Sequence, residues 1–246
     1  MIRRPLGWPL PRLFAHRCGG ALAPENTLAG LCLAASLGMR AVEFDVMLSA
    51  DGSPWLIHDE TLERTTDGTG RVCETSDREL RRLDAGRWWH PAFAGEPLPT
   101  LASAAGFCRR LGLRANVEIK PAAGFEAVTG EVVARQVRAL WAATELPLVS
   151  SFSATALAAA RAAVPELPLG SLHERPPADW LARAKALDVL TLHCAAACLD
   201  QDLLREAGAA GIPVLCYTVD DPVRATELFR RGVAAVFCDR LDRLGD

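Results

Sequence analysis

The chain has 246 residues, half of them hydrophobic and 23% charged, with a formal net charge of -3 at pH 7. This length suits one α/β barrel with a large core, and the composition excludes a disordered chain. The small negative charge gives no basic signal for nucleic acid, so a small anionic substrate would need local positive charge.

The N-terminal segment has two arginines and several prolines but no apolar stretch, which argues against a signal peptide. No apolar run approaches the length of a membrane-spanning helix, so none is expected. The eight cysteines form no Cys-x-x-Cys pair, and several lie in apolar runs. We interpret them as reduced core residues, with a disulfide framework or a zinc site as the alternative, and predict a cytoplasmic protein.

Strand-like and helix-like segments alternate from one end of the chain to the other. The strand candidates are short, mostly apolar on both faces, and rich in Val, Ile, Leu and Phe, as buried parallel strands are. They are Arg12–His16, Ala41–Leu48, Ala115–Lys120, Leu146–Phe152, Leu167–Leu172, Val189–His193, Pro213–Val219 and Ala234–Cys238.

Helical patterns fill the intervals between these strands, with Asn26 or Thr27 as the candidate N-cap of the first helix. The expected helices are Thr27–Leu37, Leu101–Leu111, Glu126–Ala143, Ala154–Val164, Ala178–Leu187, Gln201–Ala210 and Pro222–Arg231. This alternation predicts one closed (β/α)₈ TIM barrel over residues 1–246, with a doubly wound open sheet as the alternative. The barrel is favoured because no Gly-x-Gly-x-x-Gly turn follows the first strand.

The interval from Asp59 to Pro99 is too long for an ordinary loop between strand and helix. It contains a turn-rich run, a short helix near Asp77–Leu83, and an aromatic cluster that includes Trp88 and Trp89. We interpret residues 59–99 as a small insertion after the second strand. The cluster either contacts substrate or forms a mini-core that fastens the insertion to the barrel.

The strand Ala41–Leu48 carries Glu43 and Asp45 on one face, because strand side chains two residues apart point the same way. Acids among apolar neighbours repel each other and lose solvation, so a cation is expected between them. Glu118, on the next predicted strand, would join them where parallel strands end. Carboxylate ligands without Cys or His favour a hard cation, Mg²⁺ or Ca²⁺.

His16 and His58 follow strand-like segments that flank these acids, and Arg17 and Lys120 add positive charge. Such a group suits the cleavage of a phosphate ester, because cations neutralise phosphoryl oxygens while one imidazole donates a proton and the other accepts one. The alternatives are structural histidines and an ordinary ion pair between Glu118 and Lys120.

Several motifs occur in a fixed order: Ala15-His16-Arg17, Pro24-Glu25-Asn26-Thr27, Glu43-Phe44-Asp45-Val46, Ser49-x-Asp51-Gly52, His58-Asp59-x-x-Leu62-x-Arg64-Thr65-Thr66, Asn116-x-Glu118-Ile119-Lys120, Ser151-Phe152 and Tyr217-Thr218-Val219. From Arg12 to Asp239 the chain resembles the glycerophosphodiester phosphodiesterase family, in particular its compact bacterial cytoplasmic branch. The resemblance implies a (β/α)₈ barrel with a small insertion after the second strand.

The resemblance also implies three groups of site residues: the metal ligands Glu43, Asp45 and Glu118, the acid–base pair His16 and His58, and the phosphate-binding residues Arg17 and Lys120. The implied reaction is hydrolysis of a deacylated phospholipid, such as glycerophosphocholine or glycerophosphoethanolamine, to glycerol 3-phosphate and an alcohol. Attack by the neighbouring glycerol hydroxyl, through a cyclic phosphate, and direct attack by water both stay open.

Two rival functions also stay open, as does the oligomeric state. One is a phosphodiesterase on the same barrel with another substrate, of the lysophospholipase D or phosphoinositide type. An exposed apolar lip or a basic membrane patch would favour it. The other is a barrel that binds phosphodiesters without catalysis.

Two positions depart from the family pattern. Cys18 stands where the family usually has glycine, and it would distort the loop if that position needs a positive φ, unless Gly19 and Gly20 absorb the change. A thiol beside Arg17 could also have a lowered pKa. Asp220 stands where asparagine is common, and it is expected to cap the last helix.

Overall fold

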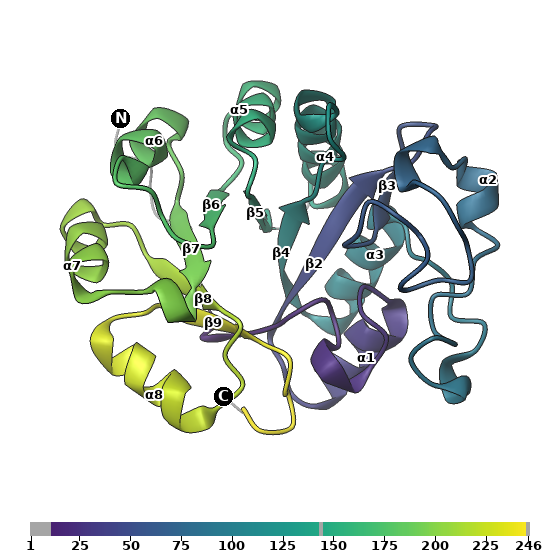
Figure 1. Ribbon diagram of the computed structural model, residues 1–246, viewed down its shortest axis with the longest axis horizontal. Coiled ribbons are helices and arrows are strands. Elements are labelled where there is room, and N and C mark those ends of the chain that lie inside the picture. The colour runs from purple at the N-terminus through teal and green to yellow at the C-terminus, as the bar shows by residue number, and fades with distance from the viewer. Residues whose placement is uncertain (1–10, 143–144, 245–246) are drawn as a thin grey trace.

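The computed structural model describes residues 11–142 and 145–244, and its strands close into a barrel surrounded by helices (Figure 1). Eight strands run parallel around the barrel: β1 (Leu13–Ala15), β2 (Ala41–Leu48), β4 (Arg114–Ile119), β5 (Leu148–Ser151), β6 (Leu169–His173), β7 (Thr191–Ala195), β8 (Val214–Tyr217) and β9 (Ala235–Cys238). Strand β1 pairs with both β2 and β9. This closure confirms the TIM barrel and excludes the open sheet.

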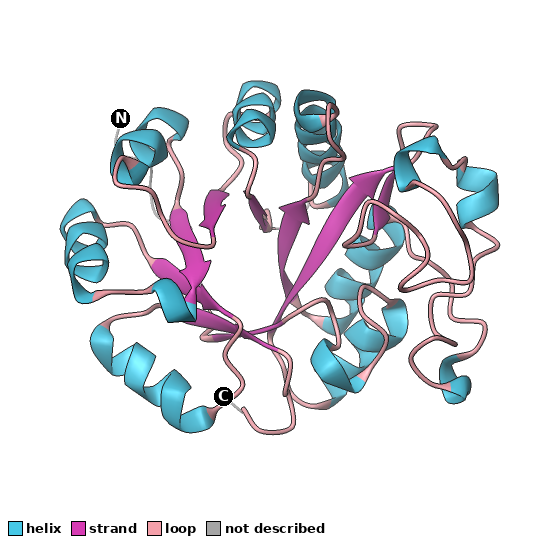
Figure 2. Cartoon of the chain, in the orientation of Figure 1, coloured by secondary structure: helices cyan, strands magenta, loops and turns pink. Residues whose placement is uncertain are grey.

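The helices form the outer layer of the barrel (Figure 2). They are α1 (Leu28–Ser36), α3 (Leu101–Leu111), α4 (Glu126–Leu140), α5 (Ala154–Ala163), α6 (Trp180–Leu187), α7 (Gln201–Ala210) and α8 (Pro222–Arg231). Thr27 is the N-cap of α1, since its side chain accepts a hydrogen bond from Gly30 N–H. Helix α4 ends at Leu140, earlier than predicted, and the predicted end at Ala143 lies outside the described residues.

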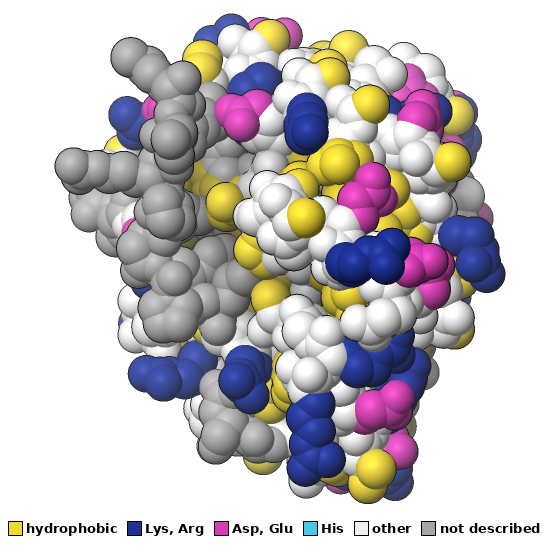
Figure 3. All heavy atoms as spheres, turned by 90° about the vertical axis from the view of Figure 1, so that its left-hand side faces the viewer, with side chains coloured by type: hydrophobic (Ala, Val, Ile, Leu, Met, Phe, Trp, Pro, Cys, Tyr) yellow, Lys and Arg dark blue, Asp and Glu magenta, His cyan; other side chains and the backbone are white. Residues whose placement is uncertain are grey.

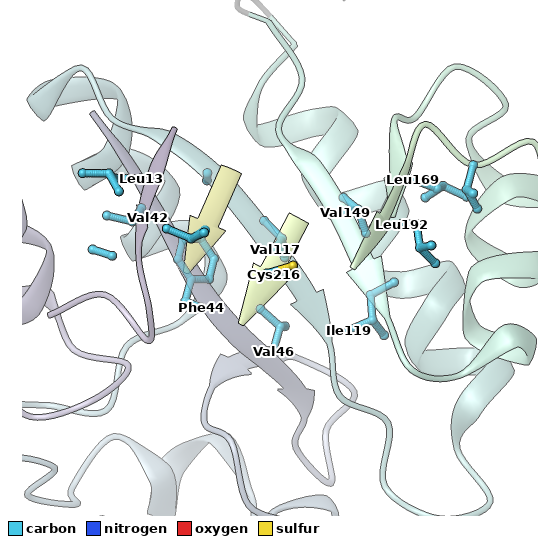
Figure 4. Close-up of a cluster of buried hydrophobic side chains, with 14 of the residues drawn as sticks. Leu13, Val42, Phe44, Val46, Val117, Ile119, Val149, Leu169, Leu192 and Cys216 are labelled. Carbon is cyan, nitrogen blue, oxygen red and sulfur yellow. The ribbon is translucent and has the colours of Figure 1, made fainter. Parts of the chain in front are cut away.

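Successive side chains of each strand point alternately toward the surrounding helices and into the barrel, which separates the main apolar core from the polar interior. Val42, Phe44 and Val46 of β2 are fully buried in the apolar layer that includes residues of the surrounding helices. Figure 4 shows them beside side chains of neighbouring strands. Glu43 and Asp45, between them in sequence, therefore point the other way, into the barrel. A separate cluster with Phe14, Ala41, Leu148, Leu215, Ala235 and Phe237 fills part of the interior.

The predicted insertion is present and has its own small core. It begins after β3 (Pro54–Leu56), a short antiparallel partner of β2 that is not one of the eight predicted barrel strands. It contains one short α-helix, α2 (Asp77–Leu80), and two 3-10 helices, Val72–Glu74 and Pro91–Phe93. Its core consists of Met47, Trp55, Ile57, Leu62, Val72, Leu80, Ala85 and Leu98. Trp88 and Trp89 are absent from this core, and each keeps 38% of its surface exposed, so the aromatic cluster is not the mini-core.

On the face shown in Figure 3, basic and acidic side chains are interspersed rather than gathered into one charged field. Among the described residues, no helix combines the length and the apolar character that crossing a membrane requires.

Candidate active site

All seven predicted site residues line one cavity at the carboxyl ends of the barrel strands. The cavity holds about 180 Å³. Its polar wall consists of His16, Arg17, Glu43, Asp45, His58, Asn116, Glu118, Lys120, His193 and Thr218. Its apolar wall includes Phe152, Leu172, Tyr217 and Phe237. We call this space the central cavity. The barrel thus brings together residues that are more than 100 positions apart in sequence.

Strand register places the three carboxylates side by side. Asp45 of β2 lies opposite Glu118 of β4, and Glu43 lies one inward-facing position further back on β2. All three residues are buried, and one carboxylate oxygen of each lies within 4.8 Å of the others. The sequence prediction that these acids meet on adjacent strands is confirmed.

The acids are costly to ionise in this position. Burial raises the pKa of Glu43 well above its ordinary value, and the nearby Asp45 and Glu118 raise it further. Burial likewise raises the pKa of Glu118, with Asp45 adding to the effect and Lys120 opposing it. A bound cation would reverse both effects, because it favours the ionised forms.

The donor set of this cluster fits a hard divalent cation. Glu43 Oε1 and Glu118 Oε1 are buried and accept no hydrogen bond from the residues described. The nearest cation to Glu118 Oε1 is Lys120 Nζ, at 3.5 Å. Unsatisfied buried carboxylate oxygens are acceptors without donors, and carboxylates are the ligands that Mg²⁺ and Ca²⁺ prefer.

Hydrogen bonds from the loop after β1 hold the acids in position. Asn26 binds Asp45 twice, with its Nδ2 donating to Asp45 Oδ2 at 2.9 Å and its Oδ1 accepting from the Asp45 N–H at 3.0 Å. The Arg17 N–H donates to Glu43 Oε2 at 2.9 Å. Asn26 was not predicted to serve the site, although its place in a recognised motif was a signal.

His16 follows β1 and lies beside the cluster of three carboxylates. Its Nε2 is 3.9 Å from Glu43 Oε2, and its Nδ1 is 2.8 Å from Asp239 Oδ1. Asp239 comes directly after β9, the barrel neighbour of β1. Its carboxylate fixes the ring orientation and directs Nε2 toward the cavity. The sequence analysis gave Asp239 no role, and only the closure of the barrel pairs it with His16.

His58 has the same arrangement on the other side of the cavity. Its Nδ1 is 2.7 Å from Asp59 Oδ1, and Lys120 Nζ lies 3.1 Å from its Nε2. An ammonium group has no acceptor, so Nε2 accepts this bond and the ring proton sits on Nδ1. Burial lowers the pKa of His58 from its ordinary value, in line with a neutral imidazole.

Arg17 and Lys120 supply positive charge from opposite sides. Arg17 pairs with Glu25 at 2.9 Å, and its Nε is 3.9 Å from Asp45 Oδ2. Burial opposes the charge of Arg17, but Asp45, Glu25 and Glu43 outweigh it and raise its pKa. Lys120 does form the ion pair with Glu118 that was the alternative, yet its Nζ is closer to His58.

An arginine that the sequence analysis did not select joins the two sides. Arg64 donates to Asp59 Oδ2 at 2.5 Å and to both carboxylate oxygens of Glu25, at 2.7 and 2.8 Å. Because Asp59 binds His58 and Glu25 binds Arg17, Arg64 connects the supports of both groups. The hydrogen bonds from Arg64 lower the pKa of Asp59 well below its ordinary value.

Cys18 stands where the family usually has glycine, and the structure shows how a larger side chain fits there. Cys18 has φ of 72° and is fully buried, so the position does require the left-handed backbone that favours glycine. Gly30 makes room for its side chain, since a Cβ there would lie 3.0 Å from the Cys18 Cβ. Burial raises the thiol pKa well above its ordinary value, so the expectation of a lowered pKa beside Arg17 is wrong.

The substitution Cys18→Gly is therefore expected to be nearly neutral. It relieves left-handed strain of about 1–2 kcal/mol, but it removes a buried side chain and frees the unfolded backbone. We expect kcat/KM to change less than about threefold and Tm by only a few °C. A loss of activity of tenfold or more, with an unchanged Tm, would show that the thiol acts in the site.

Asp220 is placed differently from its prediction. Its carboxylate accepts from the N–H groups of Asp239 and Arg240, at 2.7 and 3.0 Å. The N-cap of α8 is the next residue, Asp221, which accepts from Val223 N–H. Asp220 thus holds the turn that carries Asp239 toward His16, because the chain after β9 passes beside the start of α8.

Comparison with known proteins gives one consistent family. The sequence model of the glycerophosphoryl diester phosphodiesterase family matches residues 16–243. A glycerophosphodiester phosphodiesterase of Caldanaerobacter subterraneus is 29% identical over 227 residues, covering 92% of this chain and 93% of the relative. Human glycerophosphodiester phosphodiesterase 1 is 42% identical over 108 residues, which cover 43% of this chain and 33% of the relative.

Solved structures have the same fold. A phosphodiesterase of Oleispira antarctica, solved in complex with its product sn-glycerol-3-phosphate, is 39% identical with a TM-score of 0.90, covering 94% of each chain. A glycerophosphodiester phosphodiesterase of Agrobacterium tumefaciens is 28% identical with a TM-score of 0.79, covering 95% of this chain and 98% of that one.

Proposed function

The chain belongs to the glycerophosphoryl diester phosphodiesterase family, and from that premise we propose that it hydrolyses glycerophosphodiesters to glycerol 3-phosphate and an alcohol. The proposed substrates are deacylated phospholipids such as glycerophosphocholine and glycerophosphoethanolamine. The observation that carries the proposal is the meeting of three carboxylates, two carboxylate-bound imidazoles and two fixed cations in one cavity. The product bound to the Oleispira antarctica phosphodiesterase supports the same chemistry.

The two cations face the place where the phosphodiester would lie. The guanidinium of Arg17 and the ammonium of Lys120 both line the central cavity and lie about equally exposed, at 23% and 21% of their side chains. They would bind the non-bridging phosphoryl oxygens from opposite sides. Their charges would stabilise the negative charge that gathers there in the transition state.

His16 and His58 would carry the protons of the reaction. Each ring has its Nδ1 beside a carboxylate and its Nε2 on the side of the cavity. One Nε2 would take the proton of the attacking hydroxyl, and the other would donate a proton to the departing alkoxide. Both the cyclic-phosphate route and direct attack by water need such a pair.

Glu43, Asp45 and Glu118 would hold a divalent cation, Mg²⁺ or Ca²⁺, which supplies a positive centre that polarises a substrate oxygen. The unsatisfied oxygens of Glu43 and Glu118 support this assignment. Removal of divalent ions with a chelator is expected to abolish turnover. Added Mg²⁺ or Ca²⁺ should restore it, and full activity after dialysis against the chelator would exclude the three-carboxylate site.

One assay separates the proposed function from its rivals. The purified protein is incubated with metal and glycerophosphocholine, lysophosphatidylcholine or glycerophosphoinositol. Glycerol 3-phosphate is measured for the two glycerophosphodiesters, and free choline is measured for lysophosphatidylcholine, whose cleavage leaves the acyl chain on lysophosphatidic acid. We expect glycerol 3-phosphate from glycerophosphocholine. Faster cleavage of the lysophospholipid would favour the lipid-directed rival, for which the exposed rings of Trp88, Trp89 and Phe152 are the relevant feature. Binding without cleavage would identify a non-catalytic barrel.

A further inference from the structure

A second cavity, of about 400 Å³, adjoins the central cavity on the His16 side. The two cavities share His16, Arg17 and Thr218 in their walls. The outer wall of the second cavity is formed by Trp88 and Trp89, and the remaining side chains with charge are Glu25 and Asp239. We call it the tryptophan cavity. A phosphodiester held at Arg17 would extend one of its two alcohols into it.

The two indole rings meet edge to face and stay partly exposed. Their centroids are 5.9 Å apart and their planes meet at 68°. The Trp88 ring is held in place because its Nε1–H donates to the carbonyl oxygen of Ala85 at 2.9 Å. Two aromatic faces set at a wide angle and left partly exposed are the geometry that attracts an organic cation.

The segment that carries these rings, residues 84–96, is rigidly organised. The Asp84 carboxylate accepts from the N–H groups of Gly86, Arg87 and Gly95, at 2.8 to 2.9 Å. These bonds lower the pKa of Asp84 to about 2. Glu96 fastens the segment to helix α1 by accepting from Ala29 N–H at 2.9 Å. The rings are therefore positioned before any ligand binds.

The charges around the tryptophan cavity also favour a cation. Two carboxylates line it against one guanidinium, that of Arg17. Glu25 is already shared between Arg17 and Arg64. Asp239, by contrast, pairs with no arginine or lysine among the described residues. Its side chain is 36% exposed, and its ion-pair partner is the ring of His16. Asp239 thus presents a partly exposed carboxylate in the wall of this cavity, where it can face an ammonium group.

A competing groove lies on the His58 side, lined by Lys120 and by the exposed ring of Phe152. There the ammonium of Lys120 already lies over the Phe152 ring, 5.9 Å from its centroid. A positive charge from the protein thus occupies the aromatic face that a cationic group would need. The groove is also lined by carboxylates, among them Asp59, Glu60 and Glu126, so charge does not separate the two sites. The aromatic face that Lys120 already occupies is what favours the tryptophan cavity.

We propose that the tryptophan cavity binds the alcohol part of the substrate, and that it selects alcohols carrying a quaternary or primary ammonium group. This inference rests on the proposed function and specifies its substrate class. Trp88 and Trp89 contact the cation through their faces, and Asp239 complements its charge. The glycerol part then stays in the central cavity beside the carboxylate cluster.

The test compares two diesters that differ in the charge of the alcohol, glycerophosphocholine and glycerophosphoglycerol. Kinetics are measured for the wild type, Trp88→Leu, Trp89→Leu and Trp89→Phe. The leucine variants are expected to lower kcat/KM for glycerophosphocholine about 3- to 30-fold, with less than a twofold change for glycerophosphoglycerol. Trp89→Phe should retain most of the preference, because a phenyl face still attracts a cation. Phe107→Leu, on α3 and outside the walls of this cavity, is the matched aromatic control.

Equal losses on both diesters, or no loss on either, would overturn the proposed subsite. So would a choline-specific loss in Phe152→Leu that the tryptophan variants lack, because the cation would then lie in the competing groove. Cleavage of glycerophosphoglycerol by every variant shows that the proposed function holds even if the tryptophan cavity does not bind the alcohol. If the wild type cleaves neither diester, the proposed function fails, and quenching of indole fluorescence by choline in wild type against Trp89→Leu decides the subsite.

Discussion

Alanine in place of His16 or His58 is expected to lower kcat about 10²- to 10⁴-fold, the usual contribution of a positioned acid or base. Both rings direct Nε2 toward the central cavity while a carboxylate holds Nδ1. Neither ring belongs to the apolar core. Tm should therefore fall by only a few °C, and the measurement is single-turnover and steady-state kinetics on glycerophosphocholine.

His173→Ala is the matched control for these variants. His173 ends strand β6, and its ring bonds to Ser171 at 2.7 Å rather than facing the central cavity. It should keep kcat within about threefold of the wild type. If His16→Ala or His58→Ala retained near-full activity with a normal melting curve, the proposed acid–base pair would be wrong.

The second large effect is expected for Glu118→Gln, which keeps the shape of the side chain and removes its charge. Activity should fall about 10³-fold, because a metal ion contributes several kcal/mol to stabilising a phosphoryl transition state. The rise of Tm on adding Mg²⁺ or Ca²⁺, expected for any ligand that binds only the folded state, should disappear as well. Isothermal titration with each ion measures this loss independently of activity.

The same substitution should have the opposite effect on the metal-free protein. Burial raises the pKa of Glu118 above its ordinary value of 4.5, so the folded state holds this proton more tightly than the unfolded state. The metal-free wild type should consequently lose stability as pH rises above 4.5 through the raised pKa. Glu118→Gln cannot ionise and should avoid that loss, so its metal-free Tm at pH 8 should exceed that of the wild type.

Glu131→Gln provides the control for this pair of effects. Glu131 lies exposed on α4, where it pairs with Arg135 at 3.0 Å. The same chemical change there should alter neither metal binding nor the pH dependence of Tm. A metal-free Glu118→Gln that melts below the wild type at pH 8 would contradict the assignment of Glu118 as a carboxylate that is costly to ionise.

Much of the barrel follows from local sequence pattern. Short apolar runs between amphipathic segments predict buried parallel strands and outer helices. For strand β2, the alternation of side chains also predicts that its two acids point to the same face. Strand β3 is not among the eight predicted barrel strands, although the segment before His58 is strand-like, because it has three residues and begins with Pro54. The length of the insertion was apparent, but its core was not, because that core draws Met47 from β2 itself.

The sequence by itself determined which side chains with acid, base or charge would line the central cavity. Glu43, Asp45 and Glu118 were predicted from strand periodicity, and His16 and His58 from their place after strands, because residue type and strand position are local properties. The ordered motifs then identified the family, which the comparisons confirmed.

Tertiary structure alone decided which groups hold those side chains in position. Asp239 lies 223 residues from His16 and reaches it only because β9 closes the barrel against β1. Arg64 lies 39 residues from Glu25, and their pairing depends on how the insertion folds back over the loop after β1. Trp88 and Trp89 could be read as core or as binding surface until their exposure beside His16 and Arg17 was known. Such contacts depend on chain closure and packing, which no local pattern encodes.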